Sequence, residues 1–511
     1  MRTGLWIVAF VFICQVMNAN YQWVKDVGAK DLNTYRSGDL SAASCFDENG
    51  NLYLVSTDSF SVFNNNGMLM FSKRIMQSGE AVLPCIYVDK DESIYIAGYF
   101  TGVFDASIKA PDPYLGQYRL LKFTNDGSFL WIADGVYTSS SCSLHISCDT
   151  LGNAFVGVDY VIVDLPNPPV EMLTLSKYNS VGVEQWTKNM GGNYKLGDLQ
   201  VSSDAIYIVG FFKGEVSFGS LAPENQFNFP NEYHSFLAQF SLDGESNWVK
   251  TATTNIPNLW SYYGSIKVKK GEYIIASTSV NDNTTATSTM KLENFDMSGT
   301  LQWTKNIVHS AAFVDENAIR DIFIDEAENI ILTGGFKGQL DFSGDIISSN
   351  DSATAFLACY QKDGGFLWTK KVESQNSNVT EYSTGLAVFA VGADLYWSGD
   401  YFGTIDFNPE SGVDKLPTDV IKRKFFSKLS DYTSSTKEIQ NNSFSFYPNP
   451  CSSIVNLSVN AAQYVINDLA GKVVISGEGN TIDVSSLSPG IYTLSVQNAV
   501  EQFKVQKLLV Q

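Results

Sequence analysis

The stretch IYVDKDESIYIAG, residues 86–98, decides the fold. Two runs rich in β-branched and aromatic residues flank a short polar turn, which is the pattern of a β-hairpin. The same pattern returns in six further places, around residues 51–53, 153–155, 205–207, 272–274, 329–331 and 394–396. A unit that recurs seven times predicts a repeat architecture in which neighbouring units share a core.

A second hairpin follows the first in each unit. It is clearest in NDGSFLW, residues 125–131, where the Asn-Asp-Gly turn leads into an aromatic strand. Two hairpins make four strands, the content of one β-propeller blade. Aromatic residues occupy the same slot in successive units and are predicted to pack the blades: Phe71, Trp131, Trp186, Trp248, Trp303 and Trp368. Their spacing of 55 to 65 residues exceeds the ~40–50 residues of compact propeller repeats and predicts inserted loops.

The ends of the repeat array predict how the ring closes. The seventh unit ends with the strand at residues 424–429 and has no aromatic strand after it, whereas residues 21–25 contain a spare one around Trp23. We therefore expect Trp23 to join the blade-packing set and its strand to pair with the strand containing Phe426. This closure leaves no free edge strands. An open β-solenoid, capped at both ends, is the alternative.

Four units carry a glycine-aromatic tail after their second strand, followed by an alternating run ending in Phe, as at Phe407. The tails lie at residues 98–102, 210–214, 335–338 and 401–403. In these motifs the region 20–430 resembles a repeat family of secreted bacterial seven-bladed β-propellers. The resemblance implies the fold and says little about activity, because propellers have many functions.

Residues 1–19 have the layout of a secretory signal peptide. Arg2 supplies the positive start, residues 5–16 are apolar, and Ala19 is a small residue suited to cleavage. The apolar run is shorter than the ~20 residues that span a bilayer, so no transmembrane segment is predicted. A membrane anchor and a lipoprotein attached at Cys14 are the alternatives.

The C-terminal region has a different pattern. Residues 431–443 are polar and predict a linker, whereas residues 444–511 contain short alternating strands that predict a small immunoglobulin-like β-sandwich. The whole chain is thus predicted to be all-β. The motif positions are Tyr447, Pro448, Asn449, Pro450, Gly471, Gly490 and Tyr492.

In these motifs the C-terminal region resembles the sorting domain (type A) of type IX secretion cargo. The resemblance implies recognition by an outer-membrane translocon, removal of the domain by a sorting peptidase, and then release or attachment to a surface glycolipid. It places the protein outside the cell or on the outer-membrane surface of a Gram-negative bacterium. An ordinary immunoglobulin-like module is the alternative.

Composition excludes several classes of function. A net charge of −20 argues against a nucleic-acid partner, which needs a basic surface. Seven scattered cysteines form neither a disulfide framework nor a zinc motif, and the three histidines are expected on loops or blade surfaces. Acidic turns such as residues 89–92 resemble calcium loops but lack the distal glutamate, so we interpret them as hairpin turns.

No catalytic, cofactor or metal residue is predicted. The sequence favours a non-enzymatic binding or adhesion module that uses long propeller loops to bind a glycan or a protein. The alternative is a secreted polysaccharide hydrolase or lyase, with carboxylates gathered at the mouth of the propeller channel. Two carboxyl groups about 5–10 Å apart in a Trp- or Tyr-lined cleft would favour the hydrolase.

Overall fold

The computed structural model describes seventeen segments of the chain. They are residues 20–28, 44–108, 117–137, 143–162, 170–219, 226–251, 259–269, 271–282, 287–309, 318–349, 353–374, 381–407, 415–416, 423–432, 446–468, 472–497 and 503–511. The predicted signal peptide, 1–19, lies outside the described residues. The chain divides into two compact units, residues 1–436 and 437–511.

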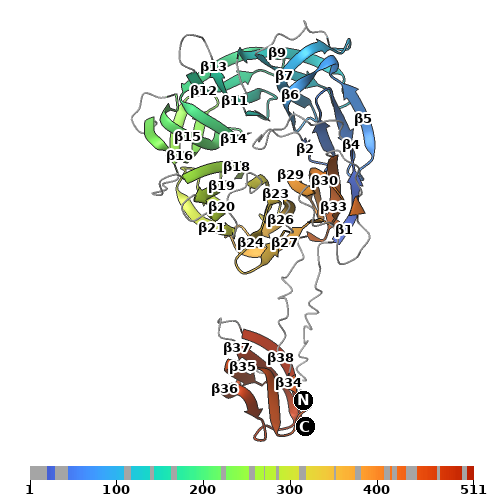
Figure 1. The fold of residues 1–511 in the computed structure, drawn as a ribbon, viewed down its shortest axis with the longest axis vertical. Coiled ribbons are helices and arrows are strands. Elements are labelled where there is room, and N and C mark those ends of the chain that lie inside the picture. The colour runs from blue at the N-terminus through green and yellow to red at the C-terminus, as the bar shows by residue number, and fades with distance from the viewer. Residues whose placement is uncertain are drawn as a thin grey trace, which may run out of the picture. The chain divides into compact units, whose positions relative to one another are not determined.

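The first unit contains seven four-stranded antiparallel blades arranged in a ring (Figure 1). From the innermost strand outward, the first three blades are β2 (Ser44–Phe46), β3 (Leu52–Val55), β4 (Ser59–Phe63) and β5 (Leu69–Arg74); β6 (Met76–Val88), β7 (Ile94–Phe104), β8 (Gln117–Phe123) and β9 (Phe129–Tyr137); and β10 (Leu144–Cys148), β11 (Ala154–Ile162), β12 (Val170–Tyr178) and β13 (Glu184–Gly191). The next two are β14 (Asn193–Val201), β15 (Ala205–Ser217), β16 (Gln226–Ser241) and β17 (Ser246–Thr251); and β18 (Leu259–Lys269), β19 (Tyr273–Asp282), β20 (Thr287–Phe295) and β21 (Leu301–His309).

The sixth blade is β22 (Ala318–Ile324), β23 (Ile330–Phe336), β26 (Thr354–Tyr360) and β27 (Phe366–Lys371). The seventh combines both ends of the unit: β29 (Tyr382–Val391), β30 (Asp394–Phe402), β33 (Arg423–Ser430) and, outermost, β1 (Asn20–Asp26). These strands confirm the seven-bladed propeller that the repeats predict.

The pairing of β1 with β33 is the one that the spare aromatic strand predicts. The two strands are antiparallel, with Lys25 opposite Phe426 and Trp23 opposite Lys428. The rings of Trp23 and Phe426 meet edge to face with centroids 4.9 Å apart, a favourable aromatic geometry. The last strand of the propeller is thereby covered by the first.

Connections of different length leave opposite ends of the blades. Turns between first and second strands, and between third and fourth strands, contain at most five residues, as at 47–51, and lie at what we name the turn end. Within the propeller, every connection longer than five residues, such as 105–116 and 403–422, leaves the other end, which we name the loop end. Because Asn20 lies opposite Ser430, both ends of the propeller chain are at the turn end.

Two of the four glycine-aromatic tails lead into straps between neighbouring blades. The hairpin of β24 (Gln339–Asp341) and β25 (Ile346–Ser348), from blade six, pairs with β21 of blade five. The hairpin of β31 (Ile405–Asp406) and β32 (Lys415–Leu416) pairs in the same way with β28 (Glu373–Ser374), which follows the outer strand of blade six. The Phe residues that end the tails are buried: Phe104, Phe218, Phe342 and Phe407.

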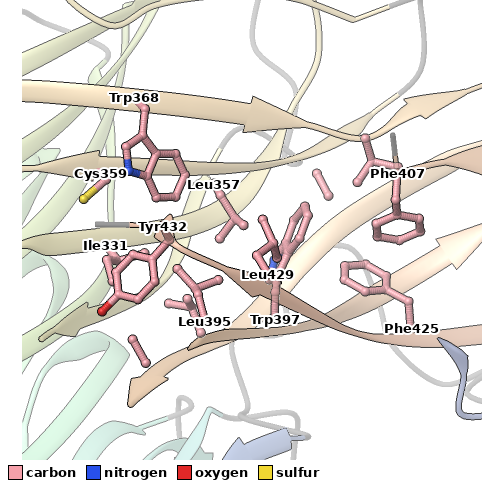
Figure 2. Packing of buried hydrophobic residues seen from close by; sticks show 14 of the residues in the cluster. Ile331, Leu357, Cys359, Trp368, Leu395, Trp397, Phe407, Phe425, Leu429 and Tyr432 are labelled. Carbon is pink, nitrogen blue, oxygen red and sulfur yellow. The ribbon is translucent and has the colours of Figure 1, made fainter. Parts of the chain in front are cut away.

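Apolar clusters fill the interfaces between blades. The cluster between blades six and seven is shown in Figure 2, where Trp397 and Phe425 from one sheet lie beside Phe407 from the strap. The ring of Trp397 meets that of Phe425 edge to face at 5.0 Å. The same cluster contains Leu357 and Cys359 of blade six and Leu395 of blade seven, so it joins the two blades.

The second unit is a small all-β domain. Its strands are β34 (Phe446–Tyr447), β35 (Ile454–Asn467), β36 (Val473–Asp483), β37 (Gly490–Gln497) and β38 (Phe503–Val510). They form one connected antiparallel sheet in the order β34-β35-β37-β38, with β36 also paired to β35. Register shifts near Ala461 and Tyr464 interrupt β35, and one apolar core includes Val455, Ile466 and Leu494.

Candidate functional site

The predicted blade-packing residues lie between blades. Five of these rings, each in the outer strand of one blade, cover the turn glycine of the next blade. A Cβ atom placed on Gly127 would lie 2.8 Å from the ring of Phe71, and one on Gly182 would lie 2.7 Å from Trp131. Trp23, Trp186 and Trp248 approach Gly67, Gly244 and Gly299 in the same way. These glycines also have φ between +69° and +84°, so both the turn and the neighbouring ring require glycine.

Indole N–H groups strengthen three of these contacts. Trp131 donates to the carbonyl of Ser180 at 3.0 Å, Trp186 donates to Leu242 at 3.2 Å and Trp303 donates to Lys362 at 3.2 Å. The first six rings, from Trp23 to Trp303, are only partly buried, and Trp368 alone is buried. These aromatic side chains therefore join neighbouring blades at the outer edge of the propeller. We name each such contact between a ring and the turn of the next blade a clasp.

A lysine two residues after the ring belongs to the same clasp, and the sequence argument missed it. Lys25, Lys188, Lys250 and Lys305 lie against turn glycines of the next blade. Lys25 Nζ donates to the carbonyl of Asn66 at 2.6 Å, and Lys188 Nζ lies 2.6 Å from Glu245 Oε1. The repeated aromatic-x-Lys spacing was a signal that could have found it.

The aspartate carboxylates of the acidic turns at the turn end accept hydrogen bonds from residues close by in sequence. Asp47 Oδ1 accepts from the amides of Asn49 and Asn51 at 2.9 and 2.8 Å, and its Oδ2 accepts from the Tyr53 hydroxyl at 3.2 Å. Asp89, Asp149 and Asp325 repeat this Asx-turn geometry. Among the residues described, no group of His, Cys, Asp and Glu is placed to hold a metal ion.

Two further aspartates join the inner strands across the channel wall. Asp198 Oδ2 accepts from the amide of Ile266 in the next blade at 3.0 Å, and Asp321 Oδ2 accepts from Val388 in the next blade at 2.8 Å. Both carboxylates follow a register shift in their strands. They satisfy amides on an inner edge that no further strand covers.

Burial governs the electrostatics of Asp321 in this wall. Burial raises the pKa of Asp321 to about 7, although the ammonium of Lys267 opposes the rise, and the negative charge of Asp198 adds to it. Burial lowers the pKa of His145, whose Nδ1 lies 3.7 Å from Asp198 Oδ1. A carboxyl group that titrates near neutrality therefore lies near a second carboxyl group.

The histidine prediction needs correction. His145 is 5% exposed on the inner strand β10, and His234 is 4% exposed and stacks on Phe229 with centroids 3.8 Å apart. Both are interior residues. His145 lies beside the carboxylate of Asp198, and His234 packs against the ring of Phe229. For His309 only the backbone is described, in β21.

In the C-terminal unit the motif residues connect its first and last strands. Asn449 Oδ1 accepts from the amide of Leu509 at 2.8 Å, and the Tyr492 hydroxyl donates to the carbonyl of Ser488 at 2.8 Å. Tyr447 is 63% exposed, Pro448 and Pro450 flank Asn449 in the exposed opening segment, and Gly490 begins β37. Gly471 lies outside the described residues.

Comparisons with known proteins address the two units separately. Residues 445–511 match a family described as a secretion system C-terminal sorting domain. No curated protein sequence matches the chain. No helix in the described segments is long and apolar enough to cross a membrane.

Solved structures similar to the chain include propellers. The WD40 domain of Pan2 from Neurospora crassa is 10% identical, with 83% of this chain and 98% of that chain covered and a TM-score of 0.42. A chain of the mitotic checkpoint complex is 10% identical, covering 82% and 98%, with a TM-score of 0.42. A Bacteroides caccae protein of unknown function is 8% identical, covering 63% and 93%, with a TM-score of 0.30.

These likenesses concern the fold alone, and the propeller assignment depends on the strand pairing described above. The family match and the strand order together characterise both units. The chain contains a seven-bladed β-propeller, and its residues 445–511 match the secretion system C-terminal sorting domain family.

Proposed function

We propose that the propeller is a non-enzymatic binding module, carried to the cell exterior by its sorting domain, that binds a glycan or a protein. One observation carries this proposal. The carboxylates that could serve acid–base chemistry are engaged in holding the fold: Asp198 and Asp321 accept amides of the next blade, and Asp47 accepts amides of its own turn. Carboxylates committed to backbone amides are poorly suited to transfer protons to a substrate.

The loop end is the proposed binding surface. Within the propeller, all connections longer than five residues leave this end, whereas the connections at the turn end contain at most five residues. Binding residues of rigid scaffolds are concentrated in such connections. The turn end carries both described ends of the propeller, Asn20 and Ser430, so a propeller attached through its C-terminal side would leave the loop end free.

The sorting domain supports the remaining proposals on partners. An outer-membrane translocon would recognise it, a sorting peptidase would remove it, and the propeller would then be released or attached to a surface glycolipid. The predicted signal peptide, 1–19, would provide the first export step. These partners define where the propeller acts and leave its ligand to be found by binding experiments.

A polysaccharide hydrolase or lyase is the second candidate, and one observation favours it. Asp321 has a pKa near 7 and is influenced by the charge of Asp198, the type of pairing that separates an acid from a base in glycoside hydrolysis. The described aromatic neighbours of this wall include Phe323 and Phe389, whose rings lie 4.9 Å apart, rather than a Trp-lined cleft.

The test compares binding with turnover on the chain without its signal, residues 20–511. A glycan array and a pull-down against bacterial and host surface proteins should give saturable binding. Soluble-sugar release from the bound polysaccharides should stay at the level of buffer. Release that disappears in Asp321→Asn, with binding retained, would overturn the binding module in favour of the hydrolase.

A further inference from the structure

One of the seven aromatic positions at the outer edge of the propeller, that of Trp368, differs from the others. In six blades a ring covers the tight turn of the next blade, but the seventh blade has no such turn, because its outer strands are the two ends of the chain. Trp368, the ring that faces this blade, therefore has no turn carbonyl to meet. Its Nε1 is buried without a hydrogen-bond partner among the described residues, and the side chain is 8% exposed.

Tyr432 lies in the cluster beside Trp368, at the place where the other blades have a turn. It lies two residues after β33, within the predicted linker 431–443, yet it is only 1% exposed and belongs to the same apolar cluster as Trp368 and Leu429. Figure 2 shows its ring among the side chains of this cluster. The amide of Asp431 donates to the carbonyl of Ala393 at 2.9 Å and fixes the chain just before it.

The Tyr432 hydroxyl also completes the turn of blade six. In blades one and two the turn aspartate accepts from a tyrosine six residues later, Tyr53 for Asp47 and Tyr95 for Asp89. In blade six that position is Ile331, which has no hydroxyl. The Tyr432 hydroxyl donates instead to Asp325 Oδ2 at 3.1 Å.

We propose that Tyr432 is the C-terminal clasp of the ring and must stay with the propeller when the sorting domain is removed. It takes the place of the missing turn beside Trp368, and it gives Asp325 the tyrosine hydroxyl that Asp47 and Asp89 receive within their own blades. The consequence for processing rests on the proposed function, in which a peptidase hydrolyses the chain after export. The clasp itself is a property of the purified protein, so a failure of ligand binding would leave its test unaffected.

The experiment digests the chain of residues 20–511 with chymotrypsin under native conditions and measures the mass of the surviving propeller. We expect a fragment that retains Tyr432 at or before its C-terminal end. Tyr432→Phe, which keeps the ring and loses the hydroxyl, should be digested about fivefold faster, as expected for one lost hydrogen bond. Tyr432→Ala should be digested at least ~10-fold faster, because a buried aromatic is removed.

Tyr447→Ala is the matched control, since Tyr447 is a largely exposed tyrosine of the sorting domain. It should leave the propeller fragment and its rate of loss unchanged. If Tyr432→Ala prevents folding, the comparison of Tyr432→Phe with the parent still decides the matter. A stable parent fragment that ends at Leu429, or a Tyr432→Phe propeller digested at the parent rate, would overturn the proposal.

Discussion

Asp321 gives the propeller a predictable dependence on pH. Its pKa is raised from 3.8 to about 7 in the folded state, so the fold favours the neutral acid. Between these two values the folded chain holds a proton that the unfolded chain has lost. Stability from this group is therefore present below pH ~4, falls as pH rises through that window, and is level above pH ~7.

The size of the effect follows from the shift. A full shift from 3.8 to about 7 corresponds to about 4 kcal/mol at 1.36 kcal/mol per unit. Asp321 is only partly buried by surface exposure, because its strand lines the channel, and solvent screening reduces the figure to about 2 kcal/mol. Asp321→Asn removes the titration, although it also loses one acceptor for the amide of Val388 or Ile322, at about 1 kcal/mol at every pH.

The assay is urea unfolding of the parent and of Asp321→Asn at several pH values from 5 to 8.5, followed by tryptophan fluorescence. The free energy of unfolding of the variant, relative to the parent, should rise by about 1 kcal/mol across this range, because the part of the window below pH 5 lies outside it. Asp243→Asn, on an exposed turn of blade four, should follow the parent profile. A constant difference between Asp321→Asn and the parent would refute the reasoning.

Three further predictions concern the clasp, the turns and the sorting domain. Trp186→Ala should lower the free energy of unfolding by about 2–3 kcal/mol, and Trp186→Phe by about 1 kcal/mol because only the bond to Leu242 is lost; equal losses in urea unfolding would contradict the clasp. Millimolar calcium should leave the melting temperature unchanged, because Asp47 and its equivalents are occupied by turn amides; a rise in calorimetry would contradict this. Asn449→Ala should loosen the last strand by about 1 kcal/mol and reduce export several-fold, measured as protein in the culture medium; full export would contradict the link between motif and strand.

The sequence predicts the propeller well because its signals are local. Alternating residues around a polar turn indicate each hairpin, as at residues 86–98. The count of units also predicts which strand pairs with the strand of Trp23. The contact that gives each aromatic its role is not local. Trp131 meets Gly182 in the next blade, and only the register of two sheets places them together.

The channel wall and Tyr432 were missed for related reasons. Asp198 and Asp321 lie within strands rather than at turns, and their role depends on register shifts that alternation does not reveal. Tyr432 is surrounded in sequence by polar residues, so a composition argument places it in a linker. It is buried because its ring packs in the apolar cluster between blades six and seven and its hydroxyl donates to Asp325.

The closed ring is tested most directly by a cross-link between its two ends. Val24 lies opposite Ser427 in the pairing of β1 with β33, and directly opposed residues of antiparallel strands are close enough for a disulfide. In Val24→Cys with Ser427→Cys, mild oxidation should join the two peptides, as seen by mass spectrometry, while Val24→Cys with Ser72→Cys in blade one should remain unlinked. Failure of the first pair to link, or equal linking of both pairs, would contradict closure by the N-terminal strand.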